Sequence, residues 1–139
     1  MMLTYFAYGS NMCPDQMQSR CPGAASIGIA ELHDHRFMIN ERGVATVVPR
    51  QRSVVAGVLW DITATHVEVL DGFEGVAKGN YTREVVPIQS RSPGSEAIIY
   101  IACHDTPSTP RPGYLERVIS GAQFFGLDGD YVTNLRSWA

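Results

Sequence analysis

The stretch from Val54 to Ile62, Val-Val-Ala-Gly-Val-Leu-Trp-Asp-Ile, is the strongest strand signal in this sequence and restricts the fold most. β-Branched and aromatic side chains of this kind favour the extended backbone of a sheet. Similar short apolar runs lie before and after it and are expected to be further strands of one sheet. We expect strands over residues 3–7, 27–32, 36–40, 44–48, 54–62, 81–88 and 96–103. Pro49 is expected to end the fourth of these strands, and Arg42-Gly43 to form a turn.

Helices are fewer than strands. Pro14-Asp15 begins a short helix over about 14–20. Thr63 caps a second helix, whose Val67 and Leu70 face the core. The other helices are expected over 114–126, ended by a glycine, and over 130–138, whereas 89–95 and 105–113 are loops. Because the strands come in runs, the pattern predicts an α+β domain with a mixed, largely antiparallel, barrel-like sheet and flanking helices.

The length of 139 residues predicts a single domain over 1–139, large enough for its own hydrophobic core. The chain has a net charge of −3, and its 11 lysines and arginines are scattered along the sequence. Binding to nucleic acid or to a membrane surface usually requires a basic cluster, which the sequence does not show. No apolar stretch is long enough to span a bilayer, and the first residues lack the features of a secretion signal. Three cysteines, an odd number, indicate reduced thiols, so we expect a cytoplasmic protein.

The first candidate site follows the first expected strand, at Tyr8-Gly9-Ser10-Asn11. A glycine lets the backbone approach a ligand closely, because no Cβ intervenes. The amides of Gly9, Ser10 and Asn11 could converge on a carboxylate or an oxyanion. The same residue types also dominate ordinary turns, so a tight turn without function is the competing interpretation.

Glu74, in Asp71-Gly72-Phe73-Glu74-Gly75, is the second candidate. A carboxylate in a partly apolar cleft has its pKa raised toward the working pH, which suits a general base. A solvated loop carboxylate is the alternative. Tyr81 and Tyr114 could orient a substrate through their hydroxyl groups, although such rings often only pack.

Metal and nucleotide sites have little support in the sequence. Cys13 and Cys21 lack a matching Cys/His pair, and His33 with His35 supplies only two ligands. No phosphate-binding loop or dinucleotide fingerprint is present. We therefore expect neither a metal nor a cofactor.

At Phe6-Ala7-Tyr8-Gly9-Ser10-Asn11-Met12 the sequence resembles the opening motif of the gamma-glutamylcyclotransferase-like proteins, which include the AIG2-like group. The resemblance extends over nearly the whole chain. It continues through Arg42–Pro49, Val55–Ile62, Leu70–Gly75, Gly79-Asn80-Tyr81, Pro112-Gly113-Tyr114 and Gly126-Leu127 with Tyr131. The departures from the family pattern lie in loops and in length, where substrate preference is set.

The resemblance implies an enzyme that cyclises a γ-glutamyl compound to 5-oxoproline and releases an amine or amino acid. It implies Glu74 as the catalytic acid and base, with Tyr8, Gly9, Ser10, Asn11, Tyr81 and Tyr114 binding the substrate. The partner is then a small γ-glutamyl molecule, with no metal, nucleic acid or membrane.

Several alternatives stay open at this point. The leaving group could belong to a γ-glutamyl amino acid, a γ-glutamylamine, a γ-glutamyl-lysine fragment or glutathione. The chain could also be a noncatalytic domain of the same fold that binds a small carboxylate or a protein, since a fold can outlive its activity. The oligomeric state is not indicated.

Overall fold

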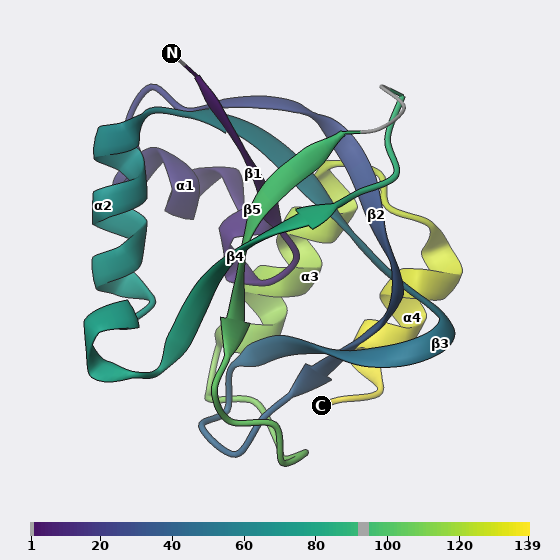
Figure 1. Cartoon of the computed structure of the whole chain (residues 1–139). Coiled ribbons are helices and arrows are strands. Elements are labelled where there is room, and N and C mark those ends of the chain that lie inside the picture. The colour runs from purple at the N-terminus through teal and green to yellow at the C-terminus, as the bar shows by residue number, and fades with distance from the viewer. Residues whose placement is uncertain (1, 92–94) are drawn as a thin grey trace.

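Two long antiparallel strands, β2 (Ala25–Ile39) and β3 (Ala45–Ile62), form one side of the sheet. The computed structural model describes residues 2–91 and 95–139 (Figure 1). The expected break between strands 27–32 and 36–40 is wrong, because β2 passes through it with a bulge. Asp34 adopts a φ of 61° there, and its carboxylate accepts the N–H of Arg52 at 3.1 Å. This contact between the two strands stabilises the bulge. In the sequence alone, the polar residues there suggest a loop.

The expectation that Pro49 ends a strand is also wrong. Pro49 lies inside β3 and is paired with His35 of β2. On its other side, β3 is paired with β1 (Leu3–Ala7) only over Val58–Ile62. A proline, which has no N–H to donate, is tolerated where a strand is an edge on one side.

The sheet has the strand order β2-β3-β1-β5-β4. β1 is antiparallel to β3 and parallel to β5 (Glu96–Ala102), and β5 is antiparallel to β4 (Tyr81–Pro87). The mixed, largely antiparallel sheet is therefore confirmed. It is not closed, but a bridge between Glu31 of β2 and Gln89 brings its two edges together at one point and gives it the barrel-like curvature.

Four α-helices flank the sheet: α1 (Pro14–Arg20), α2 (Ala64–Phe73), α3 (Tyr114–Phe124) and α4 (Gly129–Arg136). Two 3₁₀ turns, η1 (Ser10–Met12) and η2 (Val76–Lys78), follow β1 and α2. All four helices lie where the sequence predicts them. Thr63 caps α2 as expected, since its hydroxyl accepts the N–H of His66 at 3.2 Å. The expected loop over 89–95 lies in part outside the described residues.

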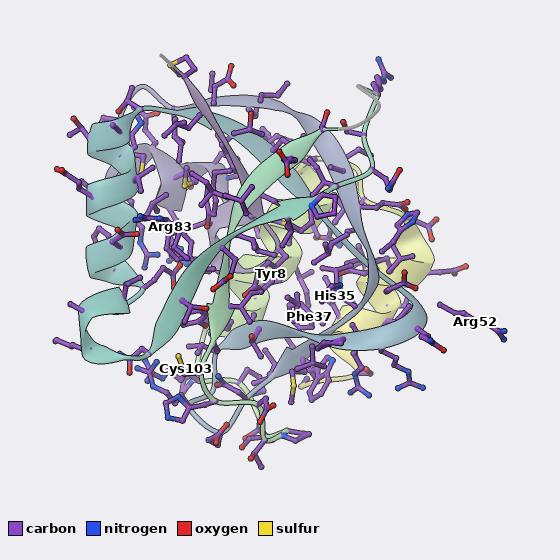
Figure 2. The ribbon with its side chains drawn as sticks, viewed as in Figure 1. Tyr8, His35, Phe37, Arg52, Arg83 and Cys103 are labelled. Atoms are coloured by element: carbon purple, nitrogen blue, oxygen red, sulfur yellow. The ribbon has the colours of Figure 1, made fainter. Side chains whose placement is uncertain are left out.

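The hydrophobic core lies between the sheet and the helices, and the end of β1 is packed within it. Val67 and Leu70 of α2 are buried, as their spacing predicts, and so are the core-facing residues of α3, namely Leu115, Val118, Ile119 and Ala122. Tyr8, directly after β1, lies in the middle of the molecule, whereas Arg52 projects outward from the bulge in the paired strands β2 and β3, beside Asp34 (Figure 2). The central strand thus delivers the predicted loop to the interior.

The cysteines carry no disulfide. Cys13 and Cys21 are buried and Cys103 is exposed, and all three are free thiols. Among the described residues, no helix combines the length and the apolar character that crossing a bilayer would demand.

Candidate active site

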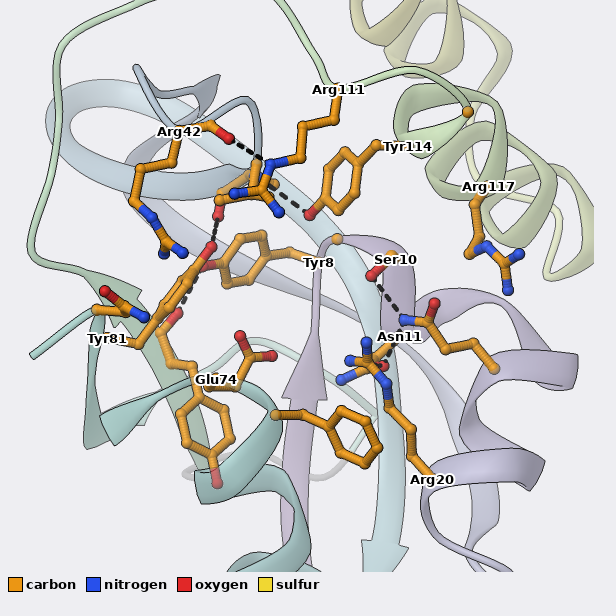
Figure 3. A pocket seen from close by; sticks show the side chains of 18 of the residues that line it. Tyr8, Ser10, Asn11, Arg20, Arg42, Glu74, Tyr81, Arg111, Tyr114 and Arg117 are labelled. Atoms are coloured by element: carbon orange, nitrogen blue, oxygen red, sulfur yellow. Dashed lines mark hydrogen bonds between the residues drawn. The ribbon is translucent and has the colours of Figure 1, made fainter. Parts of the chain in front are cut away.

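A cavity of about 420 Å³ opens at one end of the sheet, where β1, α2 and β4 meet the start of α3 (Figure 3). All seven residues that the sequence singles out line it: Tyr8, Gly9, Ser10, Asn11, Glu74, Tyr81 and Tyr114. They come from three segments that are far apart in the chain, residues 8–11, 74–81 and 114. The fold therefore brings the opening motif and the Glu74 segment to one place.

Gly9 lies between β1 and η1, and its missing side chain makes room for α3. A Cβ at Gly9 would be 3.0 Å from the hydroxyl of Tyr114 and 3.3 Å from the Cβ of Ala45. A larger residue would push the tyrosine away from the loop. The glycine expected to admit a ligand thus also admits the Tyr114 side chain.

The Asn11 side chain is buried and connects β1 with α1. Its amide group donates to the Tyr5 hydroxyl at 3.0 Å, and its oxygen accepts from Gln16 at 2.8 Å and from Arg20 at 3.2 Å. Gln16 also contacts the hydroxyl of Ser10 at 2.6 Å. With these contacts, Asn11 positions its neighbours, and Arg20 in particular, at the wall of the cavity.

Glu74 is the residue directly after α2, and its backbone N–H still donates to Leu70 O at 2.8 Å. Its carboxylate faces the cavity, and no group among the described residues donates a hydrogen bond to it. Burial raises the pKa of this carboxyl from 4.5 to about 7, although the positive charges of Arg20 and Arg42 act in the opposite direction. At neutral pH, Glu74 is therefore able both to take up a proton and to give one back.

Two tyrosine hydroxyls hold the backbone of Ala45, at the start of β3, above the cavity. Tyr81 donates to Ala45 O at 2.6 Å, and Ala45 N–H donates to the Tyr114 hydroxyl at 3.0 Å. Tyr8 donates to the carbonyl oxygen of Tyr100. Tyr8 and Tyr81 thus donate their protons within the protein, whereas the Tyr114 hydroxyl accepts from Ala45 and also interacts with Ser10. Burial raises the pKa of all three phenols, so they stay protonated.

The end of α2 is tied to the sheet by a small polar network beside the cavity. Asp71 accepts the Tyr100 hydroxyl at 2.7 Å and forms an ion pair with Arg83 of β4. Asp71 precedes Glu74 by less than one helical turn. The network therefore restrains the segment that presents Glu74.

Residues 54–135 match the AIG2-like family, and this span is more than half of the chain. The chain belongs to the AIG2-like family. The gamma-glutamylcyclotransferase of Mus musculus is 29% identical to it over 145 residues, which are 96% of this chain and 77% of the relative. The gamma-glutamylcyclotransferase of Bos taurus is 30% identical with the same coverage. A solved structure named gamma-glutamyl cyclotransferase superposes with a TM-score of 0.92 at 25% identity, covering 100% of this chain and 89% of that one.

These relatives confirm the resemblance that the sequence motifs indicate and the fold class that goes with it. The relatives named gamma-glutamylcyclotransferase support an enzyme of this family.

Four arginines of this AIG2-like chain line the cavity and are absent from the sequence-based prediction: Arg20, Arg42, Arg111 and Arg117. The guanidinium of Arg20 lies 4.3 Å from the centre of the Phe73 ring. Arg20 and Gln16 are four residues apart on a predicted helix, so their shared face was visible in the sequence. Arg42 and Arg111 are brought together by the fold alone, and no local pattern signals them.

Proposed function

We propose that this chain is a γ-glutamyl cyclotransferase in which Glu74 moves the proton. The α-amine of the substrate attacks its own γ-glutamyl carbonyl carbon, forming a new C–N bond. The C–N bond to the leaving group then breaks, and the products are 5-oxoproline and a free amine or amino acid. The position of Glu74 supports this most directly, because its carboxylate shares a cavity with the loop after β1 and has a pKa of about 7.

The proton balance of this reaction fits one carboxylate. The attacking amine must lose a proton, and a carboxylate with a pKa near 7 is a stronger base than an ordinary glutamate. The departing amine must gain a proton, and the neutral Glu74 carboxyl can return it. No proton is gained or lost over the cycle. Because both reacting groups belong to one molecule, the protein accelerates the reaction by holding the glutamyl chain in its cyclising shape.

The negative charge that develops on the carbonyl oxygen needs a hydrogen-bond donor. The Tyr114 hydroxyl is suited to this, because its oxygen is already held by Ala45 N–H at 3.0 Å. The amides of Gly9 to Asn11 would then bind the same oxygen or the α-carboxylate of the substrate. Arg20, fixed by Asn11 and Phe73, adds a positive charge on the side of this loop.

Release of 5-oxoproline from a panel of γ-glutamyl compounds tests the proposal. We expect wild-type protein to release it and Glu74→Gln to lose at least about three orders of magnitude in kcat, since the amide has the same shape but cannot take up a proton. Glu68→Gln, an exposed substitution on the same helix, is the matched control and should retain activity.

Two results would count against the proposal. Full activity of Glu74→Gln would remove Glu74 from the mechanism. Binding of γ-glutamyl compounds without any release of 5-oxoproline would favour a noncatalytic carboxylate-binding domain.

A further inference from the structure

The cavity carries the opposite charge to the chain as a whole. Its charged lining residues are the four arginines and Glu74, which leaves an excess of three positive charges when Glu74 is ionised. The chain has a formal net charge of −3. A positive, partly enclosed site in an acidic protein attracts anionic ligands and repels cationic ones.

Arg42 and Arg111 form a pair at one side of the cavity. Arg111 Nε donates to the carbonyl oxygen of Arg42 at 2.7 Å, and Arg111 N–H donates to Gly43 O at 3.0 Å. Gly43 has a φ of 76°, and a Cβ there would be 2.7 Å from Arg111 Cγ. The loop before α3 is therefore seated tightly on the β2–β3 turn, and it places the Arg111 side chain against the backbone of Arg42.

The remaining N–H groups of this pair lack an acidic partner. The structure forms no ion pair between either arginine and an acidic residue within the described part of the chain. A carboxylate can accept paired hydrogen bonds from a guanidinium group, which makes it a well-matched partner for either arginine. The guanidinium of Arg42 and the terminal N–H groups of Arg111 are therefore available to an anion in the cavity.

The cations of the cavity lie on different sides of Glu74 (Figure 3). Arg20 lies with Asn11, beside the loop after β1, and Arg42 and Arg111 lie together near Tyr81 and Tyr114. A substrate whose reacting bond is next to Glu74 therefore meets positive charge at both of its ends. In the proposed reaction, the glutamyl α-carboxylate would lie at one of these ends and the leaving group at the other.

We propose that Arg42 and Arg111 form a subsite for the leaving group and that the preferred leaving group is an amino acid with an acidic side chain. This inference rests on the proposed function. A γ-glutamyl dipeptide with a neutral second residue brings two carboxylates, and one with an acidic second residue brings three, so the acidic compound places one more negative charge among the four arginines. A site built to pair charges discriminates against ligands that leave them unpaired.

The test compares γ-glutamyl-glutamate with γ-glutamyl-glutamine, which have nearly the same shape and differ in one charge. We expect wild-type kcat/KM to favour the glutamate compound by roughly 10- to 100-fold. In Arg42→Met and in Arg111→Met, this ratio should fall to within about threefold of unity. Because Arg42 also acts on the pKa of Glu74, the readout is the ratio between two substrates, in which an effect on Glu74 cancels.

Arg50→Met is the control for the loss of one positive charge, since Arg50 is exposed on β3 and does not line the cavity. It should keep the wild-type ratio. Arg42→Met is the primary variant, because its guanidinium makes no hydrogen bond to the described residues, and Arg111→Met checks the result independently. A ratio near unity in wild-type protein, with 5-oxoproline released from both compounds, would overturn the subsite and leave the proposed function standing. An equal loss of kcat/KM for both compounds in the variants would also overturn the subsite and would assign Arg42 and Arg111 to binding of the glutamyl portion instead.

Calorimetric measurement of substrate binding to the Glu74→Gln variant tests the leaving-group subsite separately from the proposed enzymatic activity. Tighter binding of γ-glutamyl-glutamate than of γ-glutamyl-glutamine, lost when Arg42→Met is added, supports the subsite even if wild-type protein releases no 5-oxoproline. Equal dissociation constants for the two compounds would contradict it.

Discussion

Glu74 is costly to ionise in the folded protein, and its proposed role as acid and base depends on this cost. Most glutamates are solvated, but here the end of α2 brings the carboxylate into a cavity where burial outweighs two nearby arginines. A group of this kind with a pKa of about 7 changes its charge over the range in which cells work. Rate and stability should therefore both depend on pH in this range, in directions that can be worked out.

The activity should rise with pH through about 7. Only ionised Glu74 accepts a proton from the substrate amine, so kcat/KM should increase as the pH passes its pKa. Initial rates of 5-oxoproline release between pH 5 and 9 measure this. A profile that is flat from about pH 5 upward would indicate an ordinary carboxylate with an unshifted pKa.

The stability should change in the opposite direction. Because the folded-state pKa of Glu74 lies above its ordinary value of 4.5, its contribution is fully present below about 4.5 and is lost as the pH rises through about 7. Glutamine does not titrate. We expect Glu74→Gln to raise the free energy of unfolding by about 1 to 3 kcal/mol at pH 8, relative to its effect at pH 4, with screening by solvent in the open cavity favouring the lower value. Denaturant titrations of both proteins at the two pH values provide the comparison. A difference that is the same at pH 4 and pH 8 would contradict the shift.

The sequence allows the residues of the loop and of the Glu74 segment to be predicted, because each group is local. Gly9, Ser10 and Asn11 are consecutive, and Glu74 follows directly after a capped helix. The pairing of Arg42 with Arg111 depends on a loop folding back over a distant turn, and no local spacing encodes it. The second use of Gly9, as room for Tyr114, is likewise visible only in three dimensions.

Among the elements, the helices were predictable and the lengths of β2 and β3 were not. The helices have caps and apolar faces, which are local signals. The strand breaks expected at His33–His35 and at Pro49 do not occur, since pairing between β2 and β3 continues past both. Cross-strand pairing is a tertiary effect, and it overrides the local preference of a proline or a polar run.

The contact between α3 and η1 links the packing of an element to the site. Gly121 of α3 faces this turn, and a Cβ there would be 2.5 Å from Met12 C and 2.6 Å from Cys13 N. Backbone atoms cannot move aside as a side chain does. We expect Gly121→Ala to destabilise the protein by about 1 to 3 kcal/mol and to lower kcat/KM, because η1 carries Ser10 and Asn11.

The control for this substitution is Gly129→Ala. Gly129 is exposed in α4, and an added Cβ there meets nothing within 4 Å, so the variant should be unchanged or up to about 1 kcal/mol more stable. Denaturant midpoints measure both variants. Equal stability of Gly121→Ala and wild type would mean that α3 and η1 can separate without cost.

At the scale of the whole molecule, the fold gathers positive charge that the sequence distributes widely. The arginines of the cavity come from α1, the β2–β3 turn, the loop before α3 and α3 itself. The net charge of −3 gives no sign of this concentration. The proposed preference for anionic substrates therefore depends on where the charges are placed and not on their number.

Salt should weaken this attraction selectively. Raising the ionic strength from about 0.02 to about 0.5 M shortens the distance over which charges act to a few ångströms. KM for γ-glutamyl-glutamate should then rise several-fold with little change in kcat, because screening acts on the capture of the anion. KM for γ-glutamyl-propylamine, which has one carboxylate where γ-glutamyl-glutamate has three, should rise much less. If KM rises equally for both compounds, the four arginines do not select the leaving group by charge, and shape must set the substrate preference.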